Sequence, residues 1–555
     1  MLPENLHPLV QSWFTSTYGK PTAVQAEAWP LIAEGANVLA LAPTGSGKTL
    51  AAFLVALSRF ADGTLPPDRL SVLYVSPLKA LNEDIRRNLL EPLASLSAHF
   101  RERGQSFPDI AVATRSGDTP QSERRRFITK PPAILALTPE SLAILLLNAR
   151  ARTILSEVRY VVLDEIHAVL GTKRGAFLAC QIARLALSAG EFQRVALSAT
   201  VNPPQAAADF VGGLRPASGL EAVSGTAAAE PVISDQVISD QVIYEKREVK
   251  IVAPPAEKRI DFVVEYPEEG AGSEFRADDE RQLEAEADSI GETYLRTEWE
   301  NIVEASYSEP DENTDDAGAD YVSGKDGTGT ELENVKNRNF AAREGTQSIA
   351  RSACRLRYGS RYVVLIDRIA DRIRVNRTTL VFTDARRRAE RIAFLLNELF
   401  GTTVAFAHHG SLSKEVRQAV ETRLAEGRLP CVVATGSLEL GIDIGSVDEV
   451  ILAGSPGWSS VALQRIGRAG HGVGMTSLGR LIPFHGLDLL TGIALAGAVD
   501  EREIESVSAI ENPLDILAQI ILALCTETPR NADELYWILR GFPPFAALPR
   551  ISYDR

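Results

Sequence analysis

The residues with the clearest capacity for chemistry form the segment from Ala42 to Thr49, which reads APTGSGKT. Binding a phosphate requires several backbone N–H groups that converge on it, and glycines permit the backbone angles that such a loop needs. A helical pattern follows, and a helix N-terminus favours a bound anion. Lys48 is expected to meet the β- and γ-phosphates of ATP, and Thr49 to bind Mg²⁺. The predicted nucleotide-binding residues here are Thr44, Gly45, Ser46, Gly47, Lys48 and Thr49.

A pair of adjacent carboxylates ends the apolar run in VVLDEIH, residues 161–167. Asp164 is suited to hold Mg²⁺ through water, and Glu165 to orient or deprotonate a water that attacks a phosphate. An Asp-Glu pair after a strand is more often a helix start without a catalytic role. Because a phosphate-type loop precedes it in the same part of the chain, we predict that both carboxylates are catalytic.

Two arginines lie three residues apart in QRIGRAGH, residues 464–471, and therefore share one face of a helix. Guanidinium groups suit the charge that develops on a transferring γ-phosphate. By themselves, Arg465 and Arg468 would more often belong to a solvated helix face. Together with the loop and the carboxylates, they predict an ATP site closed between two domains.

The elements that must position these residues are apolar runs alternating with helical patterns, which is typical of parallel sheets with crossover helices. The chain shows two such series, separated by a long connection, so we expect an α/β fold with two units. The first series contains Val38–Ala42, Val72–Val75, Ile134–Leu137, Tyr160–Leu163 and Val195–Leu197. The second contains Thr379–Phe382, Cys431–Ala434 and Val450–Ala453.

The connection contains two expected short edge strands, Val249–Val252 and Ile260–Glu265, and then a strongly acidic segment. Residues 265–344 hold 24 Asp and Glu against 7 Lys and Arg, a net charge of −17. The whole chain carries −15, so the remaining residues sum to +2. The acidity therefore does not argue against a nucleic-acid partner for the rest of the chain. The composition of residues 267–355 is typical of a disordered or loosely helical segment.

The composition excludes several other classes. The chain has 555 residues with 45% hydrophobic and 24% charged residues, as in ordinary soluble proteins of more than one domain. No apolar run approaches the roughly 18 residues that span a bilayer, and the N-terminus lacks the pattern of a secretory signal. We therefore expect a cytoplasmic protein without a membrane partner. Its four cysteines are far apart and form no CxxC pair, which indicates neither a zinc site nor a disulfide framework.

The motifs, with Ser198-Ala-Thr200 among them, resemble those of superfamily 2 helicases of the DEAD/DEAH-box type. Several segments resemble still more the large helicase-related, Lhr-like, proteins. These are SPLKALNED (76–84), RSGDT (115–119), LTPESL (137–142), HHGSLS (408–413) and ATGSLELGIDIG (434–445). The resemblance covers residues 1–265 and 360 to about 550. It implies two RecA-like P-loop domains in tandem, with the acidic insert between them.

The resemblance also implies domain boundaries. The first RecA-like, ATP-binding domain is expected at 1–215, the connection at 216–266, the acidic insert at 267–355 and the second RecA-like domain at 356–500. Residues 501–555 resemble the start of the family's winged-helix domain, truncated at Arg555. We therefore expect the apolar face of its first helix to lack part of its cover; that face is Leu514, Leu517, Ile520, Ile521 and Leu524.

The family's roles transfer to matching positions. Gln25 is implied to bind the adenine base, and its amide is able to pair with N6 and N7 of adenine. His167, Ser198 and Thr200 are implied to couple the nucleotide state to the grip on nucleic acid. Gly441 and Asp443 are the second domain's implied contribution to the ATP site, and Arg465 and Arg468 form the finger pair.

The implied nucleic-acid path consists mainly of hydroxyls, with a glycine amide and an arginine, on loops at strand ends. Such groups bind phosphate oxygens and read no bases, so binding is expected to be independent of sequence. Each serine or threonine taken alone is more often a turn or cap residue. The residues are Pro77, Arg115, Gly117, Thr138, Ser411 and Thr435.

The resemblance implies a Mg·ATP-dependent helicase or translocase that moves 3′ to 5′ on single-stranded DNA, with a role in DNA repair or recombination. DNA-containing duplexes and RNA remain open as partners. His167 replaces the last Asp of the DEAD motif, which favours translocation over local melting. One alternative is a P-loop ATPase that drives transport or protein remodelling. A second is a truncated, ATP-responsive nucleic-acid-binding module with ATPase activity but little strand separation.

Overall fold

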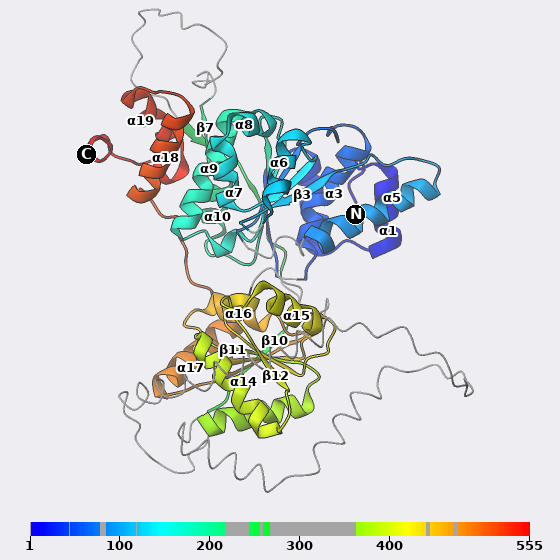
Figure 1. The fold of residues 1–555 in the computed structure, drawn as a ribbon, viewed down its shortest axis with the longest axis vertical. Coiled ribbons are helices and arrows are strands. Elements are labelled where there is room, and N and C mark those ends of the chain that lie inside the picture. The colour runs from blue at the N-terminus through cyan, green and yellow to red at the C-terminus, as the bar shows by residue number, and fades with distance from the viewer. Residues whose placement is uncertain are drawn as a thin grey trace, which may run out of the picture. The chain divides into compact units, whose positions relative to one another are not determined.

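The computed structural model describes residues 2–43, 45–77, 85–117, 119–217, 244–255, 259–266, 362–439, 445–470 and 475–555. Its contacts divide the chain into two compact units (Figure 1). Unit 1 comprises the described residues up to Pro255 and those from Ile504 onward. Unit 2 comprises the described residues from Arg259 to Glu503.

Unit 1 is built on a seven-stranded parallel sheet in the order β3-β4-β2-β5-β6-β1-β9. Most of its strands are continuous apolar runs with every residue buried, because helices cover both faces of a parallel sheet. The strands are β1 (Val38–Leu41), β2 (Val72–Val75), β3 (Val112–Arg115), β4 (Ile134–Leu137), β5 (Tyr160–Leu163), β6 (Gln193–Ser198) and β9 (Lys250–Val252). A separate antiparallel pair consists of β7 (Leu214–Pro216) and β8 (Tyr244–Lys246).

The helices of unit 1 pack in two layers. Successive strand residues point to opposite faces, and each face has its own apolar cluster. One layer contains α1 (Pro8–Tyr18), α2 (Ala23–Ala33), α3 (Lys48–Ala61) and α5 (Glu91–Glu102), the last preceded by a π-helical turn, Arg86–Leu90. The other contains α6 (Gln121–Thr129), α7 (Pro139–Leu147), α8 (Ala149–Leu155), α9 (Lys173–Ala189) and α10 (Pro204–Gly212). A 3₁₀ turn, η2 (Ile166–Ala168), lies between β5 and α9.

Unit 2 contains a six-stranded parallel sheet in the order β10-β15-β14-β11-β13-β12. Its strands are β10 (Ile260–Val264), β11 (Thr379–Phe382), β12 (Ala405–His408), β13 (Cys431–Ala434), β14 (Glu449–Ala453) and β15 (Ser477–Ile482). Its helices are α14 (Arg386–Phe400), α15 (Lys414–Ala425), η3 (Gly436–Leu438), α16 (Ser459–Ile466) and α17 (Gly486–Glu501), and residues 362–375 are also helical.

The two sheets share one topology. Numbering the first six strands of each unit along the chain gives the same spatial order, 3-4-2-5-6-1, for β1 to β6 and for β10 to β15. Loops after equivalent strands therefore occupy equivalent places at the C-terminal edge of each sheet. The predicted α/β fold with tandem parallel-sheet units is confirmed.

The segment expected as a connection contributes a strand to each sheet. β9 extends the sheet of unit 1 beside β1, and β10 extends that of unit 2 beside β15. Both are edge strands, as the sequence predicted. Residues 218–243 and 267–361, which include the predicted acidic insert, lie outside the described residues.

The C-terminal helices belong to unit 1, and the first of them and the 3₁₀ turn after the second pack on α9. They are α18 (Leu514–Glu527), α19 (Ala532–Arg540), a 3₁₀ turn at Pro543–Phe545, and α20 (Arg550–Asp554). Leu517, Ile520 and Leu524 are buried in a cluster that includes Cys180 of α9. The expectation that this helix face lacks cover is therefore wrong for these three residues, because α9, α19 and the segment of residues 542–548 supply the cover. Leu514 is exposed and Ile521 is partly buried.

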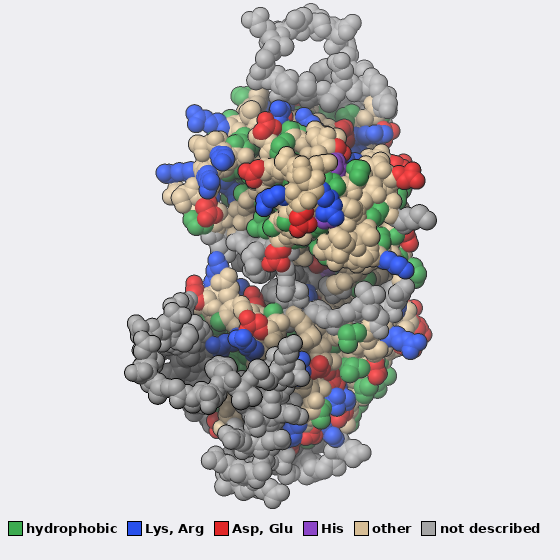
Figure 2. Space-filling model, turned by 90° about the vertical axis from the view of Figure 1, so that its right-hand side faces the viewer, with side chains coloured by type: hydrophobic (Ala, Val, Ile, Leu, Met, Phe, Trp, Pro, Cys, Tyr) green, Lys and Arg blue, Asp and Glu red, His purple; other side chains and the backbone are tan. Residues whose placement is uncertain are grey.

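The surfaces of the units are mixed in charge. On the face drawn in Figure 2, Lys and Arg side chains are interspersed with Asp and Glu. This agrees with the near balance of charge outside the acidic segment. Within the described ranges, no helix combines the length and the apolar character needed to cross a membrane.

Candidate active site

The loop after β1 has the geometry of a phosphate-binding loop. Gly45 and Gly47 both have φ of 78°, in the left-handed region, and Gly47 directly precedes Lys48, the first residue of α3. A Cβ on Gly47 would lie 2.5 Å from Gln25 Nε2, so both space and backbone angle favour glycine. Lys48 is buried, and its Nζ donates to Ala42 O at 2.7 Å. Thr44 lies outside the described residues.

Gln25 lies against this loop. Its Nε2 donates to Gly47 O at 3.1 Å, and its Oε1 accepts from the Thr22 backbone N at 3.0 Å. Thr22 Oγ1 donates to Ser46 O at 2.9 Å. The start of α2 thus fixes two carbonyls of the loop. The assignment of Gln25 to the adenine base stays a prediction.

Asp164 and Glu165 directly follow β5. The Asp164 backbone N donates to Val75 O at 2.9 Å, which places the turn beside the end of β2. Asp164 Oδ1 accepts from Glu165 N at 2.8 Å, and Oδ2 accepts from the Tyr74 hydroxyl. Glu165 has φ of 47°, which residues other than glycine seldom adopt. The strained turn holds both carboxylates at the same sheet edge as the phosphate loop.

The electrostatics connect these two segments. Burial raises the pKa of Asp164, and the charge of Glu165 raises it further. The hydrogen bond from Tyr74 and the charge of Lys48 act in the opposite direction. A divalent cation would favour the ionised carboxylate in the same way as Lys48.

Thr49 and Asp164 fit the predicted Mg²⁺ site by their chemistry. Mg²⁺ prefers oxygen ligands and usually takes only one or two from the protein, with water and phosphate oxygens completing its shell. Thr49 is the second residue of α3 and supplies a hydroxyl beside the loop. Asp164 supplies a carboxylate that already interacts with the neighbouring Lys48.

His167 connects the carboxylate turn to the end of β6. Its Nδ1 accepts from the Ala199 backbone N at 3.1 Å and lies 3.4 Å from Ser198 Oγ. The same nitrogen is 3.3 Å from Glu165 Oε2. Because Nδ1 accepts a hydrogen bond, neutral His167 carries its proton on Nε2. The structure thus brings His167 and Ser198 together as predicted neighbours, whereas Thr200 is exposed. The hydrogen bond from the Ala199 backbone N to His167 was not predicted from the sequence.

The predicted nucleic-acid residues of unit 1 lie at the ends of β2, β3 and β4, which are neighbours in the sheet. Thr138 N donates to Arg115 O at 3.4 Å, so the latter two loops touch. Burial lowers the pKa of Arg115, and the nearby Arg124 lowers it further. Arg124 Nη2 also donates to Gly117 O at 2.6 Å. Thr138 Oγ1 lies 3.4 Å from Ser141 N, where it caps α7.

In unit 2, Arg465 and Arg468 are both held by Glu439. Arg465 Nε lies 2.9 Å from Glu439 Oε2, and Arg468 Nη2 donates to Glu439 O at 2.6 Å. Arg468 is 3% exposed. Glu439 lies in the segment that the resemblance singled out, but no role was predicted for it. Gly441 and Asp443, which follow it, lie outside the described residues.

Ser411 and Thr435 follow β12 and β13, the equivalents of β3 and β4. Thr435 N donates to His408 O at 3.1 Å, which brings the two loops together. By the shared topology, the loop after β11 corresponds to the loop of Pro77 after β2. Arg386 lies there, and its Nη1 donates to Ser411 Oγ. Arg386 was not predicted as a site residue, although it is the first of three consecutive arginines at the start of α14, an unusual pattern that favours an anionic partner.

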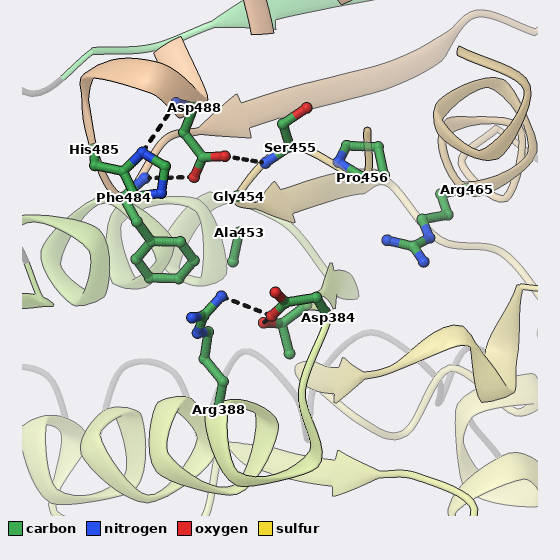
Figure 3. Close-up of a pocket in the computed structure, with 11 residues that line it drawn as sticks. Asp384, Arg388, Ala453, Gly454, Ser455, Pro456, Arg465, Phe484, His485 and Asp488 are labelled. Carbon is green, nitrogen blue, oxygen red and sulfur yellow. Dashed lines mark hydrogen bonds and ion pairs between the residues drawn. The ribbon is translucent and has the colours of Figure 1, made fainter. Parts of the chain in front are cut away.

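A pocket of about 130 Å³ opens at the C-terminal ends of β11, β14 and β15 (Figure 3). Arg388 Nη1 contacts Asp384 Oδ1 at 2.6 Å, and the Arg388 guanidinium lies 4.3 Å from the Phe484 ring centre. Asp488 accepts from Ser455 N at 3.2 Å. Arg465 lies on the side of the pocket away from Phe484. The pocket therefore lies between Arg465 and the loop after β11.

Two family models match the chain. The model described as DEAD/DEAH box helicase matches residues 22–208, and the one described as helicase conserved C-terminal domain matches residues 361–472. The first range contains the phosphate loop and both carboxylates. The second contains the two arginines.

Several relatives that match nearly the whole chain carry Lhr names. The chain is 35% identical to the Lhr helicase/probable uracil glycosylase of Mycolicibacterium smegmatis, over 98% of the chain and 31% of that protein. It is 33% identical to the ATP-dependent helicase Lhr-Core of Saccharolobus solfataricus, over 99% of the chain and 51% of that protein. The chain thus spans about a third to a half of these curated relatives.

Solved structures of helicases also match the fold of the chain. A structure of Mycobacterium smegmatis helicase Lhr bound to ssDNA and AMP-PNP superposes with a TM-score of 0.72 at 36% identity, covering 99% of this chain and 57% of that one. The DUF1998 helicase MrfA bound to DNA and AMPPNP superposes with a TM-score of 0.61 at 19% identity, covering 96% of this chain and 58% of that one. At that identity the second match shows the fold alone.

Proposed function

Because the chain belongs to the DEAD/DEAH-box helicases and resembles the Lhr proteins, we propose that it is an ATP-dependent helicase or translocase acting on single-stranded DNA. Supporting this, the M. smegmatis Lhr structure contains ssDNA and AMP-PNP. Movement from 3′ to 5′ and a role in DNA repair or recombination belong to the same proposal, and both rest on the resemblance.

In the proposed reaction, the loop after β1 and Lys48 bind the phosphates of ATP. Thr49 and Asp164 would hold the Mg²⁺, which would supply positive charge to the phosphates when bound. Glu165 orients the attacking water and accepts its proton. Arg465 and Arg468 supply further positive charge to the transferring phosphate.

The observation that carries the proposal is the contact of His167 with Ser198 and the Ala199 backbone. It links the turn of Asp164 and Glu165 to the end of β6. Through this contact, the proposed function has the nucleotide state change the grip on nucleic acid. The loops after β2, β3, β4 and their equivalents in unit 2 then bind phosphates of the strand without reading bases.

The test is steady-state ATP hydrolysis with and without single-stranded DNA, and separately with single-stranded RNA of the same sequence. We expect DNA to raise the rate at least tenfold and RNA to raise it less. Equal stimulation by both would contradict the preference for DNA. A rate that neither nucleic acid changes would contradict the proposed function itself.

A second candidate is an ATP-responsive nucleic-acid-binding module with ATPase activity but little strand separation. Displacement of a labelled strand from a duplex with a 3′ single-stranded tail separates the two candidates. DNA-stimulated ATPase without displacement would favour the module.

A further inference from the structure

Arg174 makes three polar contacts to two loops that are remote in the sequence. Its Nη1 donates to Pro77 O at 2.5 Å, in the loop after β2. Its Nε and Nη2 donate to Glu140 Oε1 and Oε2 at 2.7 and 3.0 Å, in the first turn of α7 after β4. β2 and β4 are adjacent in the sheet. Arg174 thus connects the loop after β2 with the loop after β4. These loops carry Pro77 and Thr138, which are proposed to bind phosphates of the nucleic acid.

Arg174 is also the second residue of α9, which begins just after the turn of Asp164 to His167. The segment between the two is closely packed and hydrogen-bonded. A Cβ on Gly175 would lie 2.1 Å from Val169 O, and Thr172 Oγ1 accepts from Gly175 N at 3.1 Å. Thr172 Oγ1 also donates to Val169 O at 2.7 Å. A displacement of the catalytic turn would therefore move the start of α9 with it.

The contact between Arg174 and Glu140 has little value for folding alone. The two side chains are 39% and 51% exposed, and exposed ion pairs contribute little to stability. The contact does matter for phosphate binding at Thr138. Glu140 follows Thr138 by two positions, and its negative charge would repel a phosphate held by Thr138. Burial opposes ionisation of Glu140, but the hydrogen bonds and charge of Arg174 leave its pKa lowered. Glu140 thus stays ionised and needs the guanidinium as a counter-charge.

We propose that Arg174 is a positioning residue that couples the nucleotide site to the nucleic-acid loops of unit 1. It touches neither ATP nor the reacting atoms. It transmits a shift of the Asp164–His167 turn, through the start of α9, to the loops of Pro77 and Thr138. Only arginine supplies a fork for the carboxylate together with a further donor for a carbonyl, so lysine is a partial substitute. This inference rests on the proposed function.

Coupling is measured as the ratio of two affinities, which a merely structural role would leave unchanged. Binding of a labelled single-stranded DNA to the full chain is followed by fluorescence anisotropy, with and without AMP-PNP and Mg²⁺. In Arg174→Ala we expect the ratio of the two dissociation constants to move toward one. Its difference from one should be a third or less of the difference measured for the wild type. Arg174→Lys should fall between Arg174→Ala and the wild type.

The matched control is Arg215→Ala, which removes another exposed arginine of unit 1, paired with Glu245 at 2.8 Å. It should keep the wild-type ratio, and thermal melting should show both Arg174 variants folded. A wild-type ratio in Arg174→Ala overturns this inference and leaves the proposed function standing. Failure of the wild type to bind DNA overturns both. If Arg174→Ala does not fold, the ratio in Arg174→Lys decides, and a wild-type value there overturns the inference.

Discussion

Arg465 points its guanidinium at Glu439, whose Oε2 lies 2.9 Å from both Nε and Nη2 of the arginine. The main-chain oxygen of Glu439 accepts hydrogen bonds from Nε and Nη2 of Arg468. One residue thus positions both arginines proposed to meet the γ-phosphate, but by different atoms. Only the contact with Arg465 depends on the Glu439 side chain.

The first prediction follows from that difference. Glu439→Ala should lower kcat for ATP about tenfold, about 1.4 kcal/mol in the barrier, because Arg465 loses its orientation. Glu439→Gln retains a hydrogen-bond acceptor and should lose about threefold. Glu426→Ala, which removes an exposed partner of Arg428, should have no effect and serves as the control. Wild-type kcat in Glu439→Ala would show that Arg465 is oriented by other contacts.

Lys48 and Glu165 should separate nucleotide binding from hydrolysis. Lys48→Ala should weaken both, because the side chain sits beside the phosphate loop and bonds to Ala42 O. Glu165→Gln should keep nucleotide binding within about threefold and lower kcat at least a hundredfold, because the amide preserves shape without the base. Binding of a fluorescent ATP analogue and steady-state hydrolysis measure the two effects. A normal turnover rate in Glu165→Gln would remove Glu165 from the reaction.

The fold was predictable where residues form buried parallel strands. Continuous apolar runs form β1, β2, β4, β5 and β13, and β11 departs from one only at Thr379, since helices cover both faces of each sheet. β3 was missed because it is an edge strand whose four residues, VATR, are only half-buried and show no apolar run. β15 was missed because Gly479 and Arg480 interrupt its pattern.

The site could be predicted only where its residues belong to sequence motifs. The glycines of the phosphate loop and the adjacent carboxylates have types and spacings that imply their chemistry. Arg174 and Glu439 have no such signal, because a single charged residue in a helix or loop is common. The arginine run that begins at Arg386 favours an anionic partner but does not indicate the contact with Ser411. The contacts of Arg174, Arg386 and Glu439 join segments separated by 97, 25 and 26 positions. Such pairings depend on the tertiary fold, which local sequence patterns do not specify.

His167 should matter more for coupling than Ser198. Ser198→Ala removes a hydroxyl 3.4 Å from His167 Nδ1 but keeps the 3.1 Å bond from the Ala199 backbone. We expect it to lower the ratio of DNA-stimulated to unstimulated ATPase about twofold. His167→Ala removes the acceptor of both contacts and should lower that ratio about tenfold. The two rates are measured on the same preparation, and equal effects of the variants would contradict a role for the backbone contact.

The last prediction concerns the attachment of the C-terminal helices to unit 1. Arg184 of α9 has a side chain only 2% exposed, and its guanidinium contacts Glu527 at the end of α18 and Gln181. Glu527→Ala would leave this buried cation without its carboxylate. We expect the free energy of unfolding of unit 1 to fall by about 3 kcal/mol, because breaking a buried ion pair costs more than the pair contributes.

The comparison variant is Asp515→Ala, which removes an exposed pair with Lys173 at the other end of α18. It should cost far less than Glu527→Ala, because solvent screens that contact. Urea unfolding of the full chain, followed by tryptophan fluorescence, measures both variants. The double variant Arg184→Met, Glu527→Leu should recover most of the loss, because it replaces the ion pair by apolar contact with the cluster around Cys180. A Glu527→Ala chain as stable as Asp515→Ala would show that the apolar cluster alone holds these helices in place.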